Sequence, residues 1–137
     1  MYQKIRLESK RNEVFRVYEE ERTVIEKNFM TEQGRMKEEE MLRWLRAMGI
    51  KVPQVYFSSE KIMILEDLGY ETLLDWYEQM EEENRSDYET IILQLLSWLK
   101  SFYYSTKEKF GGQIVLKDIN FRNFLVKDQE VYGIDFE

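Results

Sequence analysis

Residues 4–29 alternate between apolar and polar side chains, with short polar stretches in between. Alternation with a period of two puts successive side chains on opposite faces of a strand. The pattern predicts three strands separated by two turns, with the second strand over 14–18 and the third over 23–29. The chain is therefore expected to open with an antiparallel sheet.

Lys27 stands out in the third of these strands, because it lies between Ile25 and Phe29 on the face that the alternation assigns to the interior. An inward lysine is unusual in a sheet. Taken alone, Lys27 is best interpreted as an edge residue whose ammonium group reaches water along its alkyl chain.

A helical pattern follows over residues 31–48, where apolar residues recur at steps of three and four before Gly49 ends the run. The apolar positions are Met41, Leu42, Leu45 and Met48. The charged stretch 37–40 is most simply a solvated face of this helix.

Beyond this helix, two apolar runs predict strands over 55–57 and 62–65, and Pro53 fits the loop that leads into them. The next part of the chain is mainly helical, with a short helix over 72–80 and a long one over about 88–107. The long helix carries an apolar stripe that predicts a core: Tyr88, Ile91, Ile92, Leu95, Leu99, Phe102 and Tyr103.

The C-terminal stretch carries the candidate chemistry. Apolar runs at 124–126 and 131–134 flank a polar segment and predict a small β-hairpin. A hairpin brings its two ends together, so Asp118, Asn123 and Asp135 are expected to converge on one point. Two carboxylates and an amide oxygen suit Mg²⁺, and one carboxylate can accept a proton from a substrate.

The spacing D-x-x-x-x-N, followed by an apolar run and D-F-E, resembles the catalytic loop and metal-binding turn of protein-kinase-like phosphotransferases. The segments LKDINFRNFLV, GIKVPQVY and MILEDLG are most similar to the aminoglycoside phosphotransferase and choline kinase branch. Three strands, a helix and two strands is also the order of a kinase N-terminal lobe. The resemblance therefore covers essentially the whole chain.

The resemblance implies catalytic roles for three residues. Lys27 would contact the α- and β-phosphates of ATP, and Glu38 would pair with it, with Glu39 and Glu40 as alternative partners. Asp118 would accept the proton of the substrate hydroxyl.

The resemblance also implies the cofactor sites. Asn123 and Asp135 would be ligands of Mg²⁺. The backbone of Glu66, Asp67 and Leu68 would form the hinge that holds the adenine. Without the resemblance, the same stretch is an ordinary turn between a strand and a helix.

Three features depart from the family pattern. The first turn, ESKRNE, contains no glycine, which limits how closely its backbone amides approach phosphates. Leu116 stands where the family has a histidine, and Glu137 replaces the glycine of D-F-G.

The C-terminal lobe is expected to be short, as in a minimal kinase fold, a truncated one or half of an assembly. Its exposed underside would then be apolar, which predicts self-association or a protein partner there. The residues expected on it are Trp98, Phe102, Tyr103, Tyr104 and Phe110.

Composition narrows the classes of function. The 137 residues suffice for one domain with a core, and the absence of Cys and His excludes disulfides, thiolate chemistry and histidine bases. A cytoplasmic protein is expected. The net charge of −7 argues against nonspecific nucleic-acid binding. Neither a membrane-spanning run nor a signal peptide is apparent, so no membrane partner is expected.

We therefore predict a single α+β, kinase-like domain over 1–137. It would have a five-stranded antiparallel N-terminal lobe with one helix (1–66), a hinge (67–70) and a minimal helical C-terminal lobe with the catalytic-loop hairpin (71–137). The predicted function is transfer of the γ-phosphate of ATP, with Mg²⁺, to a hydroxyl of a small molecule or protein. The alternatives are a pseudokinase-type regulatory or interaction module without catalysis, and an unrelated acidic α+β interaction domain.

Overall fold

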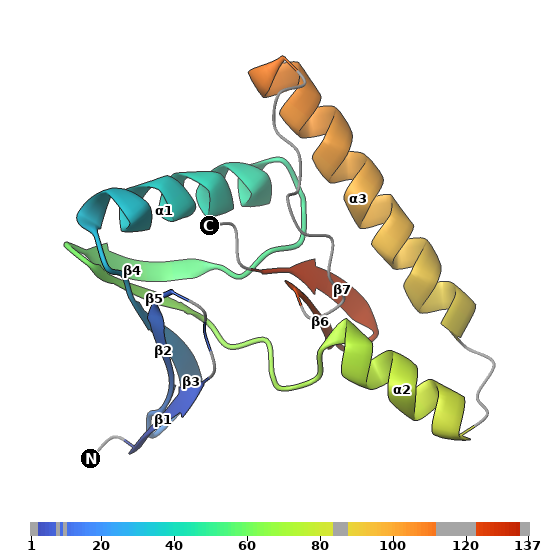
Figure 1. Cartoon of the computed structure of the whole chain (residues 1–137), viewed down its shortest axis with the longest axis horizontal. Helices are drawn as coiled ribbons and strands as arrows, with labels where there is room; N and C mark the ends of the chain where they lie inside the picture. The colour runs from blue at the N-terminus through green and yellow to red at the C-terminus, as the bar shows by residue number, and fades with distance from the viewer. Residues whose placement is uncertain (1–2, 8, 10, 84–87, 112–122, 135–137) are drawn as a thin grey trace. The chain divides into compact units, whose positions relative to one another are not determined.

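The computed structural model describes residues 3–7, 9, 11–83, 88–111 and 123–134, and it is drawn in Figure 1. These residues form two compact units. The first consists of residues 3–46 and 53–67, and the second of residues 47–52 and 68–134.

The first unit is built on a five-stranded sheet with the strand order β1-β2-β3-β5-β4, in which every neighbouring pair is antiparallel. The strands are β1 (Gln3–Leu7), β2 (Glu13–Tyr18), β3 (Thr23–Asn28), β4 (Val55–Ser59) and β5 (Ile62–Glu66). The five predicted strands are confirmed. Strand β3 lies in the middle of the sheet, between β2 and β5.

Helix α1 (Glu32–Ala47) begins after Thr31, whose hydroxyl oxygen accepts a hydrogen bond of 3.0 Å from the amide of Gly34. Its buried residues have helical spacing: Glu38, Leu42 and Leu45. The prediction of a solvated face over 37–40 is therefore wrong at Glu38, which is 3% exposed.

In the second unit, helix α2 (Leu73–Glu83) starts with a reciprocal cap. The hydroxyl of Thr72 accepts a hydrogen bond of 3.1 Å from the amide of Asp75, and the Asp75 carboxylate accepts one of 3.3 Å from the amide of Thr72. The helix runs past its predicted end at residue 80, because the glutamates that follow are good helix formers.

Helix α3 (Tyr88–Phe110) buries a stripe of side chains at steps of three and four: Ile91, Leu95, Trp98, Phe102 and Thr106. The expectation that Trp98 and Phe102 lie on an exposed underside is wrong, because both are buried. The expectation that Tyr103 belongs to the buried stripe is also wrong, because it is exposed, whereas the expectation that Tyr103 and Tyr104 are exposed is confirmed. No helix in the described part of the chain is long and apolar enough to span a membrane.

The predicted hairpin is confirmed. It consists of β6 (Phe124–Lys127) and β7 (Glu130–Gly133). Its turn residues Asp128 and Gln129 have φ values of 51° and 63°, as in a two-residue type I′ turn. Gln94 of α3 holds this turn, because its Nε2 donates to the carbonyl of Gln129 at 2.6 Å and its Oε1 accepts from the amide of Val131 at 3.1 Å.

Trp98 fastens the hairpin to the rest of the second unit. Its ring lies edge-on to Phe124, with centroids 5.1 Å apart, and stacks on Phe102 at 5.2 Å. Its Nε1 donates a hydrogen bond of 2.8 Å to the carbonyl of Lys51, which also accepts one of 3.0 Å from the amide of Gly133. One indole therefore joins α3, β7 and the segment that follows α1.

We expect Gly133→Ala to destabilise the protein, because a Cβ at this position would overlap the indole ring of Trp98. Overpacking of this kind costs about 1–3 kcal/mol in the free energy of unfolding. Urea unfolding followed by circular dichroism measures the change.

The control for this prediction combines Gly133→Ala with Trp98→Phe, which removes the part of the indole that the new methyl would meet. The double variant should lose less stability than the sum of the two single variants. Strictly additive losses would contradict a direct overlap.

Candidate functional site

Lys27 lies at the centre of the sheet of the first unit. In β3 it pairs with Val14 of β2 and with Met63 of β5, and it is 2% exposed. An edge lysine would keep its ammonium group in water, so the interpretation of Lys27 as an edge residue is wrong.

The ammonium group of Lys27 forms a buried ion pair with Glu38 of α1. Its Nζ lies 3.0 Å from Oε1 and 2.9 Å from Oε2, and 5.2 Å from the ring centroid of Phe29. Taking two charges out of water costs several kcal/mol per ion, so a buried pair adds little net stability. Its position inside a sheet therefore favours a functional role over a purely structural one.

The neighbouring glutamates on α1 have other surroundings. Glu39 accepts hydrogen bonds from Arg35 and Arg43. Glu40 is exposed. Of the three glutamates considered from the sequence, the one that meets Lys27 is Glu38.

A second buried ion pair anchors the segment that follows β5. Arg16 of β2 donates through Nε and Nη2 to the two carboxylate oxygens of Asp67, at 2.8 and 3.2 Å, and both side chains are nearly excluded from water. The two-pronged contact fixes the orientation of Asp67 as well as its position. Sequence reasoning missed Arg16, whose signal is a charge flanked by Phe15 and Val17 within a strand.

Glu66 is bonded twice to Gln54. Its amide donates to the carbonyl of Gln54 at 2.8 Å, and its Oε1 accepts from the amide of Gln54 at 3.1 Å. The amide of Glu66 is thus engaged within the first unit. Leu68 is buried in the second unit. The adenine-binding role of Glu66, Asp67 and Leu68 stays a prediction, and it would rest on backbone groups other than that amide.

The hairpin of the second unit holds the next predicted residue. Asn123 directly precedes β6, and its carbonyl accepts a hydrogen bond of 2.9 Å from the amide of Ile134. Ile134 is the neighbour of Asp135 in the chain, so the hairpin brings its two ends together at Asn123. Asp118 and Asp135 themselves lie outside the described residues.

The predicted Mg²⁺ site fits its ion by the chemistry of its donors. An amide oxygen from Asn123 and a carboxylate from Asp135 are the hard oxygen ligands that Mg²⁺ prefers. Within residues 3–7, 9, 11–83, 88–111 and 123–134, no group of three or more Asp, Glu, His or Cys side chains could hold a metal ion. The metal site therefore stays a prediction that depends on Asp135.

The sequence of the chain matches a known protein family. The model of the RIO domain matches residues 1–137, which is the whole printed sequence. The chain belongs to the RIO domain family. This domain is protein-kinase-like, of the ATP-binding phosphotransferase type, so the predicted α+β, kinase-like fold is confirmed.

The family match supports the kinase-like superfamily, and it gives no particular support to the aminoglycoside phosphotransferase and choline kinase branch. It excludes the alternative of an unrelated acidic interaction domain. A search of curated proteins finds no match to the chain.

We expect Lys27→Met to lower the free energy of unfolding by about 3 kcal/mol or more, because it leaves the Glu38 carboxylate buried without a cation. Methionine keeps the length and apolar character of the lysine stem, so little of this loss comes from packing. Urea unfolding at neutral pH measures it.

Adding Glu38→Leu to Lys27→Met removes the stranded charge, so the double variant should recover most of the lost stability. If Lys27→Met alone lowers the free energy of unfolding by less than about 1 kcal/mol, the effect is that of a solvent-exposed ion pair. This result would contradict a pair that is buried away from water.

Proposed function

We propose that this RIO domain binds ATP with Mg²⁺ and transfers the γ-phosphate to a hydroxyl group of a small molecule or a protein. The observation that carries the proposal is the buried ion pair of Lys27 and Glu38. In kinase-like phosphotransferases, a strand lysine held by a helix glutamate contacts the α- and β-phosphates of the nucleotide.

Each predicted residue has a part in this chemistry. Lys27 binds the phosphates, and Glu38 holds the lysine side chain in place. Asp118 accepts the proton of the substrate hydroxyl. The oxygen of that hydroxyl then bonds to the γ-phosphorus as the bond between the γ-phosphorus and ADP breaks. Asn123 and Asp135 hold Mg²⁺, which neutralises the charge of the phosphates.

The finer assignments belong to the same proposal. The segments GIKVPQVY and MILEDLG are similar to the aminoglycoside phosphotransferase and choline kinase branch, to which the proposal assigns the chain, with a small molecule or a protein as the acceptor. A cytoplasmic location suits a chain that has no cysteine.

The alternative function is a regulatory or interaction module, and it too has an observation in its favour. Four large side chains of α3 are exposed: Leu93, Leu96, Tyr103 and Tyr104. At 100° per residue, Leu93 and Tyr104 lie on the side of the helix opposite the buried stripe, and Leu96 and Tyr103 lie on its flank. An exposed apolar stripe of this kind suits a protein partner.

The partner we propose for this stripe is a second copy of the chain. In an antiparallel pair of α3 helices centred on residue 98, Leu93 of each copy lies opposite Tyr103 of the other. Glu89 then lies opposite Lys107, and both of these side chains are exposed. Opposite charges at the two ends of the contact would fix its register.

We expect saturating ATP with Mg²⁺ to raise the thermal midpoint of the protein by several degrees. Ligand at about 100 times its dissociation constant adds roughly 2.7 kcal/mol to the free energy of unfolding. The rise should require Mg²⁺ and disappear in Asp135→Asn. A thermal scan with ATP, with and without EDTA, measures it.

Asp128→Asn is the matched control for that experiment, because it removes one negative charge from the turn of the same hairpin and keeps the preference for positive φ. It should keep the full response to the nucleotide. Asp118→Asn should also keep the rise of the thermal midpoint with ATP and Mg²⁺. It should lose the slow hydrolysis of ATP that we expect of the wild type when no acceptor is present. The absence of any response in the wild type at millimolar ATP would contradict nucleotide binding.

We expect the wild type to form dimers at tens of micromolar, and Glu89→Lys to weaken them because two lysines would then meet. The double variant Glu89→Lys with Lys107→Glu restores opposite charges and should restore the dimer. Sedimentation velocity at low salt measures the populations. A wild type that stays monomeric at every concentration would refute self-association through α3.

A further inference from the structure

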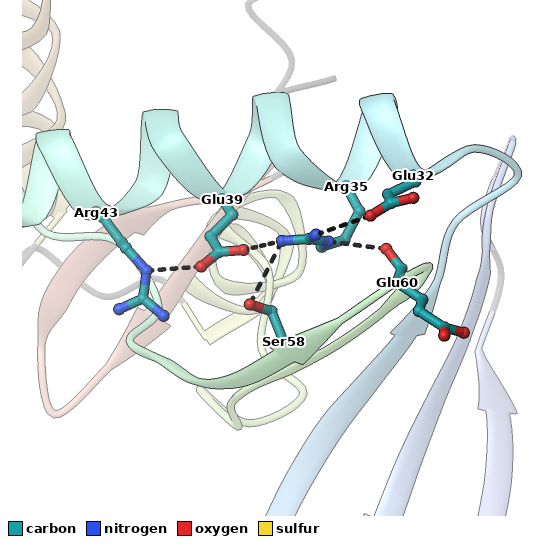
Figure 2. Close-up of polar contacts among 6 residues, drawn as sticks. All are labelled: Glu32, Arg35, Glu39, Arg43, Ser58 and Glu60. Atoms are coloured by element: carbon teal, nitrogen blue, oxygen red, sulfur yellow. Dashed lines mark hydrogen bonds and ion pairs between the residues drawn. The ribbon is translucent and has the colours of Figure 1, made fainter.

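A cluster of polar side chains lies between α1 and the β4–β5 hairpin, apart from the Lys27–Glu38 pair (Figure 2). At its centre is Arg35 of α1, whose side chain is only 12% exposed. The other members are Glu32, Glu39, Arg43, Ser58 and Glu60. All six belong to the first unit.

Arg35 ties the helix to the turn between β4 and β5. Its Nε donates a hydrogen bond of 2.9 Å to the carbonyl of Glu60, and its Nη1 lies 3.5 Å from the hydroxyl oxygen of Ser58. Glu60 has a φ of 51°, so its carbonyl is presented by a tight turn of fixed shape. A planar guanidinium on such an acceptor restricts both the distance and the rotation of the helix.

Glu39 connects this contact to the next turn of α1. One carboxylate oxygen accepts from Nη1 of Arg35 and the other accepts from Nε of Arg43 at 2.8 Å, as Figure 2 shows. Burial raises the pKa of Glu39, but hydrogen bonds from Ser58, Arg43 and Arg35 outweigh this effect and leave the pKa below its usual value. Glu39 is thus a charged carboxylate held by two arginines.

The cluster sits next to Glu38 along the same helix. Arg35 and Glu38 are three residues apart, so their side chains leave neighbouring positions on one side of α1. The other buried residues of α1 are Leu42 and Leu45, which hold the helix by packing without directional bonds. Directional contacts between α1 and the sheet thus include those of Glu38 with β3, of Glu39 with Ser58 and of Arg35 with the β4–β5 turn.

We propose that Arg35 is a positioning residue for the nucleotide site: by bonding Glu60 and Ser58 it sets the rotation of α1 at which Glu38 meets Lys27. The inference rests on the proposed function, because it concerns the same lysine. A glutamate side chain is flexible, so a contact of 2.9 Å inside the sheet requires that the backbone of α1 be held from elsewhere. The guanidinium of Arg35 holds the backbone of α1 in this way, at the end of the helix nearer to the β4–β5 turn.

The chain offers a matched control for Arg35. Arg43 lies on the same helix, is also an arginine and binds the same carboxylate of Glu39, but its side chain is 55% exposed. Arg43 bonds Glu39, a residue of its own helix, whereas Arg35 also reaches the β4–β5 turn. Arg43→Gln therefore removes an ion pair of Glu39 while the bond from Arg35 to Glu60 is kept.

The first test measures the dissociation constant for ATP with Mg²⁺ in Arg35→Gln, Arg43→Gln, Glu38→Gln and the double variant Arg35→Gln with Glu38→Gln. Arg35→Gln should weaken binding about tenfold, and Arg43→Gln less than about twofold, given the couplings typical of contacting residues. If Arg35 acts through Glu38, Arg35→Gln should have no further effect once Glu38→Gln is present. The proposal would be overturned if the fold changes in dissociation constant of Arg35→Gln and Glu38→Gln multiplied in the double variant. It would also be overturned if Arg35→Gln and Arg43→Gln weakened binding equally.

The second test needs no nucleotide, so it separates a failure of this inference from a failure of the proposed function. Acylation of lysines, followed by mass spectrometry, should be slow at buried Lys27 and fast at exposed Lys107. Arg35→Gln should raise the rate at Lys27 several-fold relative to Lys107, whereas Arg43→Gln should not. An unchanged Lys27 rate would overturn the proposal. The acylation rate of Lys27 in Arg35→Gln should also depend little on low concentrations of urea. A steep increase with urea would overturn the proposal, because the reaction would then proceed through global unfolding and not through local loss of the contact with Glu38.

Discussion

The ion pair between Lys27 and Glu38 is the constraint on which the first unit depends. Two charges that are almost fully excluded from water must stay about 2.9 Å apart, since separation inside the sheet would strand both of them. The pair thus requires that β3 be covered on both edges, by β2 and β5, and that α1 keep one rotation against the sheet. The cap at Thr31 and the bonds of Arg35 to the β4–β5 turn meet that second requirement from the start of the helix.

The second unit solves a related problem with one indole. Its hairpin is short, and two strands of this length are marginally stable by themselves. Trp98 supplies the missing packing against Phe124 and shares the carbonyl of Lys51 with the amide of Gly133. Gln94 holds the turn at the other end of the hairpin. The hairpin that positions Asn123 is therefore held at both ends by side chains of α3.

The sequence predicted the order of strands and helices well, because period two and period 3.6 are local properties of the chain. It could not predict that β3 is central, since alternation says which side chains share a face and nothing about which strands lie beside them. Lys27 was misinterpreted for that reason. The prediction of which face of α3 is buried failed for a similar reason. Trp98 and Tyr103 are both compatible with the apolar side of a helix, and only the position of the hairpin determines which of them is buried. Arg16 and Asp67 lie 51 residues apart, a separation over which no local pattern extends.

A chain of net charge −7 is an unexpected host for a nucleotide, and the arrangement of charges in the first unit resolves the difficulty. Its buried cations are matched one by one with carboxylates, as Arg16 with Asp67 and Lys27 with Glu38, so neither needs an outside anion to be stable. For Lys27 this means that the Glu38 carboxylate holds the ammonium group in place inside the sheet. Interactions in a poorly hydrated site are weakly screened, whereas distant surface carboxylates are screened by salt within about 8 Å. The electrostatic surroundings of Lys27 are therefore set mainly by Glu38, and the overall acidity of the chain has little influence on them.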